Sequence, residues 1–162
     1  MGKQNYGQPV GLKTVLVATD FSPLGTAALD RAVSLAGSRG AKLLVVHVVD
    51  PEPMVEGRRD LSRELQQTLA AATSEAQAAL DAIELSASLD IRRLVLLGNP
   101  ADQIVALAAQ DDIELVIIGA SGSNGPKRTK LGRTAQSVAG RARCRVITVS
   151  EPDDASGYHD AG

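Results

Sequence analysis

Residues 119–134, which read GASGSNGPKRTKLGRT, combine glycines with small polar side chains and with cations. Glycine allows backbone N–H groups to turn toward a ligand, because no Cβ stands in the way. A concave run of such groups, followed by the start of a helix, binds anions. The segment therefore predicts a phosphate site, with Ser123, Lys127 and Thr134 among its candidate ligands. The alternative is a solvated glycine-rich loop, since the spacing matches neither the Walker pattern nor the compact dinucleotide fingerprint.

Apolar runs and turn signals alternate along the rest of the chain. Continuous apolar runs predict strands buried on both faces, which is typical of a parallel sheet covered by helices. Five strands are expected, at 14–19, 42–48, 91–97, 113–118 and 145–149. Four helices are expected between them, from residue 23 to Gly37 or Gly40, over 61–86, from residue 100, and over 131–141.

Two strand-to-helix turns carry the same start signal. Ser22 is expected to cap the first helix with Pro23 at its first position, and Asn99 and Pro100 repeat that pattern before the third helix. Residues 50–60, with two prolines and a glycine, predict a mobile connection. These signals divide the chain into four strand–helix units and a last strand.

Such an alternation predicts an α/β domain with right-handed crossovers. We expect a single-domain Rossmann-like fold, of the adenine nucleotide α-hydrolase-like type, with a five-stranded parallel sheet in the order 3-2-1-4-5 and helices on both faces. Ligands of open α/β sheets bind beyond the carboxyl ends of the strands, where the winding direction reverses. In this order that point lies between the first and fourth strands, so Asp20 and Gly119 should face each other.

Composition limits the functional classes. With 162 residues the chain predicts one domain, over 13–150, between a flexible leader at 1–12 and a disordered tail at 151–162. The net charge of -2 argues against nucleic-acid binding, and 2% aromatic residues offer no base-stacking platform. No apolar run is long enough for a bilayer, and no signal peptide is evident, so a cytoplasmic protein is expected. Cys144, the single cysteine, is interpreted as a small buried hydrophobe.

Several motifs together resemble the universal stress protein family over about 13–150. They are VATDFS at 17–22, HVVD at 47–50, GNP at 98–100 and the glycine segment itself. The most specific one is a glycine pattern with spacings of two and nine residues, which Gly119, Gly122 and Gly132 fit. The family's nucleotide-binding branch has Ser or Thr after the last glycine. Here Arg133 stands in that position, and Thr134 follows one residue late.

The resemblance implies an adenine nucleotide, ATP or another, with or without Mg²⁺. Asp20 corresponds to the family's acidic residue near the adenosine, and it is the candidate metal ligand, directly or through water. Val48 corresponds to a residue whose backbone contacts adenine, and the glycines would wrap the ribose and phosphates. The remaining candidates from the matched motifs are Gly98, Pro100 and Arg133. The family also dimerises through its last strand, here 145–149. This implies a homodimer to which a further protein partner binds.

Each of these residues also has a purely structural interpretation. Asp20 could serve only its own turn, Val48 could be core, and Pro100 is explained by helix initiation. His47 at a strand end is more often a hydrogen-bonded structural histidine than a catalytic one. His159, in the tail, receives no role.

Three functions follow, in order of preference. The first is a homodimeric regulatory protein that binds an adenine nucleotide. The second is a dimeric interaction module of the same fold that has lost its nucleotide, which Arg133 would explain if its bulk closed the pocket. The third is a slow ATPase, because phosphoryl transfer needs a metal and a positioned nucleophile and Asp20 is the only obvious carboxylate. Arg133 could instead grip terminal phosphate oxygens through its planar fork.

Overall fold

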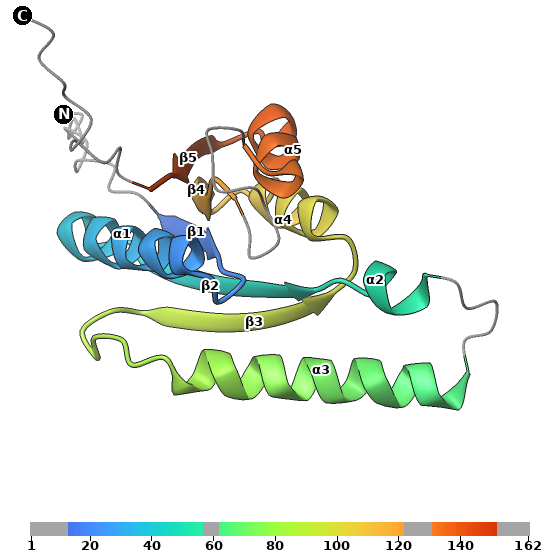
Figure 1. Cartoon of the computed structure of the whole chain (residues 1–162). Coiled ribbons are helices and arrows are strands. Elements are labelled where there is room, and N and C mark those ends of the chain that lie inside the picture. The colour runs from blue at the N-terminus through green and yellow to red at the C-terminus, as the bar shows by residue number, and fades with distance from the viewer. Residues whose placement is uncertain (1–12, 57–61, 122–130, 152–162) are drawn as a thin grey trace, which may run out of the picture.

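The computed structural model describes residues 13–56, 62–121 and 131–151. These residues form a five-stranded parallel sheet in the order β3-β2-β1-β4-β5 (Figure 1), which confirms the predicted fold class and order. The strands are β1 (Thr14–Ala18), β2 (Lys42–Val49), β3 (Ile91–Leu97), β4 (Ile113–Gly119) and β5 (Arg145–Val149). The helices are α1 (Pro23–Arg39), α2 (Glu52–Val55), α3 (Arg63–Ala82), α4 (Pro100–Ala108) and α5 (Arg133–Arg141).

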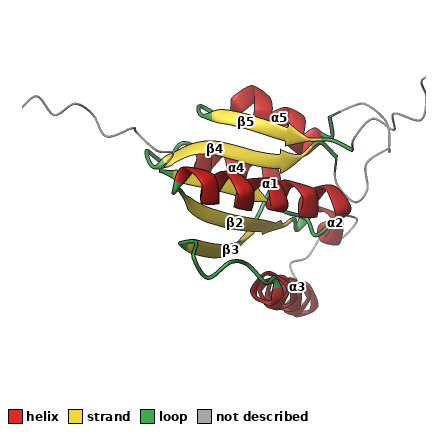
Figure 2. Cartoon of the chain, turned by 90° about the vertical axis from the view of Figure 1, so that its left-hand side faces the viewer, coloured by secondary structure: helices red, strands yellow, loops and turns green. Residues whose placement is uncertain are grey.

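Helices cover both faces of the sheet (Figure 2). α1 and α3 pack against one face, and α4 and α5 pack against the other. The central strands are therefore apolar on both sides, and Val15, Leu16 and Val17 of β1 have no exposed surface. This double burial explains why the strands are continuous apolar runs rather than alternating ones.

The register brings the carboxyl ends of the central strands to one level. Ala18 lies opposite Val46 of β2 on one side and opposite Ile118 of β4 on the other. The chain after β1 and the chain after β4 therefore leave the sheet side by side. Asp20 and Gly119 are placed at the same edge, as the sequence predicted.

The expected helix starts are confirmed. The Ser22 side chain accepts a hydrogen bond from the Gly25 N–H, and Pro23 is the first residue of α1. The Asn99 side chain accepts one from the Asp102 N–H in the same way, ahead of Pro100. Gly37 and Gly40 were the two alternatives for the end of α1, and the C-cap is Gly40. Its φ of 63° is the left-handed conformation that glycine favours.

Several elements differ from the sequence predictions: β1, β2 and β4 end one residue away from their predicted ends, and the helices differ as follows. The connection predicted over 50–60 contains the short helix α2. At its start, the Asp50 carboxylate accepts a 2.9 Å hydrogen bond from the Glu52 N–H. α5 begins at Arg133, because Gly132 is extended with ψ 161°. α3 is shorter than predicted at both ends: Ser62 caps its start, and its last helical residue is Ala82. The predictions for 1–12 and 152–162 lie outside the described residues.

The end of α3 is set by a distant strand. Ile83 is extended with ψ 117°, and its carbonyl oxygen accepts a 2.7 Å hydrogen bond from Nη2 of Arg93 in β3. A cation at the last carbonyls of a helix also complements the helix dipole. The periodicity of the helix sequence contains no trace of this contact, which explains the wrong boundary.

Cys144 lies directly before β5 and packs against the α4–α5 side of the core, as expected for a small hydrophobe. It is half-buried rather than fully buried. Burial raises the pKa of its thiol. Because the thiolate is the reactive form, the native protein should react with iodoacetamide at pH 7 more slowly than the urea-unfolded chain. The rates can be compared by mass spectrometry, and equal rates would contradict the prediction.

Among the described helices, none combines the length and the apolar character that crossing a membrane requires.

Candidate functional site

A cavity of about 660 Å³ opens at the carboxyl ends of the central strands. The chain after β1, the end of β2, the chain after β4, and the first turns of α4 and α5 contribute to its lining. It therefore lies at the point where the winding of the sheet reverses between β1 and β4, the position at which open α/β sheets bind ligands. We call it the switch-point cavity.

Most of the described candidate residues meet at this cavity. Its lining includes the predicted ligands Asp20, Val48, Pro100, Gly119, Gly132, Arg133 and Thr134. Gly98 is the exception among the described candidates, since it lines neither this cavity nor the cleft beside it. Gly122, Ser123 and Lys127 lie outside the described residues.

The interior wall of the cavity is aliphatic. Val46 and Ile104 are almost completely buried, and Ile118 is 7% exposed. Val48 belongs to the same wall but is only half-buried, so it is not simply a core residue. This wall is a surface on which a flat apolar group can lie.

The first turn of α5 also lines the cavity. Arg133, Thr134 and Ala135 contribute to that lining, and within the described part of the chain no side chain caps the helix at Gly132. α1, α3 and α4 are all capped by a side chain. The start of a helix carries a partial positive charge, so an anion would be stabilised at this side.

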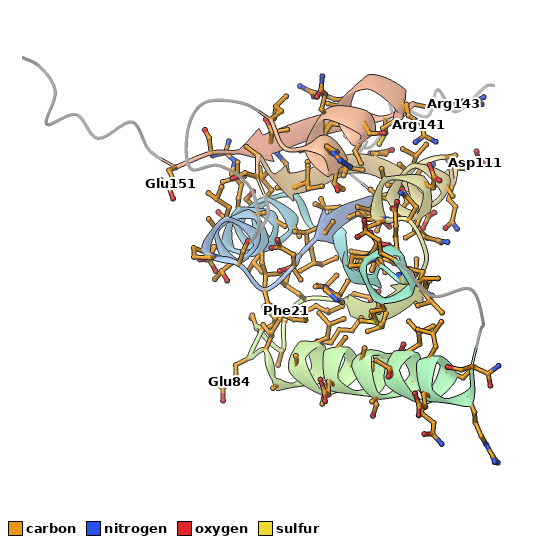
Figure 3. The ribbon with its side chains drawn as sticks, turned by 45° about the vertical axis from the view of Figure 1, so that its right-hand side comes forward. Phe21, Glu84, Asp111, Arg141, Arg143 and Glu151 are labelled. Atoms are coloured by element: carbon orange, nitrogen blue, oxygen red, sulfur yellow. The ribbon has the colours of Figure 1, made fainter. Side chains whose placement is uncertain are left out.

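Asp20 shapes the turn that borders the cavity. One of its carboxylate oxygens, Oδ1, accepts hydrogen bonds from the Ser22 N–H at 3.0 Å and from the Ser22 hydroxyl. Thr19 Oγ1 accepts another from the Phe21 N–H at 3.1 Å. Phe21, shown in Figure 3, is held in the left-handed region at φ 63°. Asp20 thus stabilises its own turn, which was one of the two roles considered from the sequence, and it also lines the cavity.

His47 is fixed by the same turn. Its Nδ1 lies 2.8 Å from the carbonyl oxygen of Thr19, which can only accept, so Nδ1 carries the proton. The ring also lies against Phe21, with 4.7 Å between the ring centroids. These contacts support the interpretation of His47 as a hydrogen-bonded structural residue at the cavity edge.

Gly25, in the first turn of α1, also lines the cavity and was not predicted from the sequence. A Cβ at this position would lie 2.7 Å from Asp20 Oδ1 and 2.9 Å from Thr19 Oγ1. The glycine is needed because the helix start and the Asp20 turn approach each other closely. A glycine inside the first turn of a predicted helix was the available signal.

Comparison with known proteins assigns the family. The model of the universal stress protein family matches residues 11–150. The chain belongs to this family. A universal stress protein of Methanocaldococcus jannaschii is 31% identical over 147 residues, covering 86% of this chain and 83% of the relative. A universal stress protein A homologue of Coxiella burnetii is 32% identical over 143 residues, covering 85% and 95%.

Solved universal stress proteins share the fold. One from Lactobacillus plantarum has a TM-score of 0.73 at 28% identity, covering 86% of this chain and 98% of the other. Another, solved in complex with cAMP, has a TM-score of 0.57 at 26% identity with the same coverage. The latter relative therefore binds an adenine nucleotide.

Two motif glycines of this universal stress protein have clear packing roles. A Cβ at Gly119 would lie 3.1 to 3.2 Å from atoms of Leu24, so the end of β4 and the start of α1 approach closely there. Gly98 has a φ of 144°, and its N–H donates to the Val49 carbonyl at 3.0 Å. Its place in the motif is thus explained by the turn between β3 and α4.

A second hollow, of about 570 Å³, adjoins the cavity. We call it the polar cleft. It lies between α2, α4 and α5, and its lining includes Glu52, Asp102, Gln136, Ser137 and Arg141. Arg141, which is labelled in Figure 3, lies with Nη1 2.7 Å from Asp102 Oδ1 and also donates to Ser137 at 3.2 Å. The contact with Asp102 ties α5 to α4.

Proposed function

We propose that this universal stress protein binds an adenine nucleotide, with ATP as the ligand, in the switch-point cavity, and acts as a regulatory homodimer in the stress response. The observation that carries the proposal is the cavity itself. An aliphatic wall and an uncapped helix start face one space of about 660 Å³, within the range of about 300–1,000 Å³ for small-molecule sites.

The adenine ring would lie against the aliphatic wall. Val48 would contact it through its backbone, and Ile104 and Ile118 would cover its faces. A chain with 2% aromatic residues and no tryptophan offers few rings for stacking, so aliphatic packing is the available mode. Asp20, at the cavity edge, would accept hydrogen bonds from the ribose or hold Mg²⁺ through water.

The phosphates would lie at the start of α5. The Gly132 N–H already donates to the Ala120 carbonyl oxygen. The backbone N–H groups of Arg133 and Thr134, together with the helix dipole, suit an anion there. Gly122, Ser123 and Lys127 remain proposed ligands from the part of the chain outside the described residues. The relative solved with cAMP supports an adenine nucleotide as the class of ligand.

Regulation suits the site better than catalysis. Phosphoryl transfer needs a metal and a positioned nucleophile. Asp20 already accepts two hydrogen bonds within its own turn. In the described part of the chain, no three His, Cys, Asp or Glu side chains are grouped to hold a metal. Any ATP hydrolysis is therefore expected to be slow.

A second candidate is a dimeric interaction module that no longer binds nucleotide. The position of Arg133 favours it, because this long side chain lines the cavity where the family has a small hydroxyl. In both cases the dimer would form through β5, which among the described strands pairs only with β4.

Thermal unfolding tests nucleotide binding directly. ATP with Mg²⁺ at ~100 times its dissociation constant should stabilise the protein by about 2.7 kcal/mol, because ligand binds only the folded state. The stabilisation should be lost in Val48→Trp, which fills the cavity from β2. Leu97→Trp is the control, since Leu97 is 47% exposed and lines neither hollow. An unchanged melting temperature at millimolar ATP would favour the interaction module.

A further inference from the structure

The switch-point cavity and the polar cleft share part of their walls. Asp50, Pro100, Arg133 and Thr134 line both of them. Two of these residues are in the first turn of α5, and Pro100 is the first residue of α4. A ligand that lies in the cavity can therefore continue past α5 into the cleft.

The two hollows differ in chemistry. The cavity has the aliphatic wall of Val46, Ile104 and Ile118. The cleft is lined instead by charged, amide and hydroxyl side chains such as Glu52, Gln136 and Ser137. The pair thus suits a ligand with an apolar ring at one end and a charged chain at the other.

Arg133 is the cation at the junction. It is exposed, and no hydrogen bond or ion pair links its guanidinium to another described side chain. Arg141, the other arginine of the cleft, is held by Asp102 and Ser137. Arg133 is therefore the described guanidinium that is available to a ligand passing from the cavity into the cleft.

We propose that the polar cleft receives the terminal phosphates of a nucleotide whose base lies in the cavity, and that Arg133 makes the site distinguish nucleotides by phosphate number. This rests on the proposed function. Guanidinium binds phosphate through two parallel N–H donors, a stronger contact than a single neutral hydrogen bond. The α-phosphate of AMP would stay at the start of α5, whereas the β- and γ-phosphates of ATP would reach Arg133.

The acidic residues of the cleft determine whether the nucleotide must bind together with a metal ion. With Asp102 paired to Arg141, Asp50 and Glu52 are the other acidic residues in the described lining of the cleft. Their charges would repel free ATP. Mg²⁺ offsets this repulsion, because it binds phosphate oxygens together with one or two carboxylates or their waters. The ligand of the cleft is therefore the Mg²⁺ complex of the nucleotide.

Calorimetric titration tests the proposal. AMP, ADP and ATP are titrated with excess MgCl₂ into the wild type, Arg133→Ala, Arg133→Lys and the control Arg143→Ala, which changes an exposed arginine outside both hollows. Arg133→Ala should weaken ATP binding about ten- to a hundredfold and change AMP binding little, since only one charge-assisted contact is removed. The ATP affinity of Arg133→Lys should lie between those of the wild type and Arg133→Ala, because lysine keeps the charge but lacks the two parallel N–H donors of the guanidinium.

The outcomes separate this inference from the proposed function. If Arg133→Ala weakens AMP and ATP equally, or leaves both unchanged, nucleotide binding stands and the role of Arg133 is wrong. If Arg133→Ala binds ATP more tightly than the wild type, the arginine obstructs the site and the inference is overturned. If the wild type binds none of the three nucleotides, the proposed function fails as well.

Discussion

Gly25→Ala should destabilise the protein by about 1–3 kcal/mol, the usual cost of overpacking, although alanine is the better helix former. The new methyl group would lie 2.7 Å from Asp20 Oδ1 and 2.9 Å from Thr19 Oγ1. Neither side chain can retreat easily, because each accepts a hydrogen bond that forms the turn. The same displacement moves Asp20 at the cavity edge, so nucleotide affinity should fall too. Urea unfolding measures the first effect and calorimetry the second.

Gly37→Ala is the matched control in the same helix. Among the described residues, the single atom that a Cβ at Gly37 would meet is Leu89 Cδ2, at 3.9 Å, which is an ordinary contact distance. The helix propensity of alanine should then stabilise the protein by about 0.5–1 kcal/mol and leave nucleotide affinity unchanged. If both variants are stabilised, the close approach at Gly25 does not constrain the turn.

Thr148→Pro should convert the proposed homodimer into monomers without unfolding them. The Val149 carbonyl bonds to the Ala120 N–H on the β4 side, so in a strand the backbone of Thr148 faces the opposite way, toward the free edge. Proline removes one outward N–H donor that a second β5 would need, and proline is tolerated on an edge strand. Thr148 is exposed, so little core packing is lost. Sedimentation velocity measures the change.

Two variants control for this effect. Thr148→Ala keeps the N–H and should remain dimeric. Ile147→Pro should instead destabilise each subunit, because Ile147 packs against the α1 side of the core and its backbone faces β4. A wild type that is monomeric at high concentration, or a Thr148→Pro variant that stays dimeric, would contradict pairing through β5.

Local signals were enough to predict most elements. The caps at Ser22 and Asn99 act within a few residues, so they can be recognised without knowing the fold. The end of α1 was predicted only as Gly37 or Gly40, and the structure selects Gly40. The apolar runs act in the same way, because a strand covered on both faces must be apolar throughout. Where a boundary depended on a distant partner, as at the Arg93 contact with Ile83, the prediction was wrong.

The position of the cavity was also accessible from the sequence. The alternation of strands and helices, together with the expected strand order, placed Asp20 and Gly119 at one edge, and both line the cavity. A ligand role was expected for Gly98 from its motif alone. The structure accounts for that glycine through its φ of 144° and places it outside both hollows.

The sequence by itself thus determined the family, the order of the elements and the edge of the sheet at which the cavity opens. It could do so because each of these depends on periodicity, capping and motif spacing, which are local. Only the tertiary structure decided that Gly25 must be a glycine, that a polar cleft adjoins the cavity and that Arg133 lines both. These features arise where α1, α2, α4 and α5 approach one another, and the distances between side chains from separate elements are set by packing.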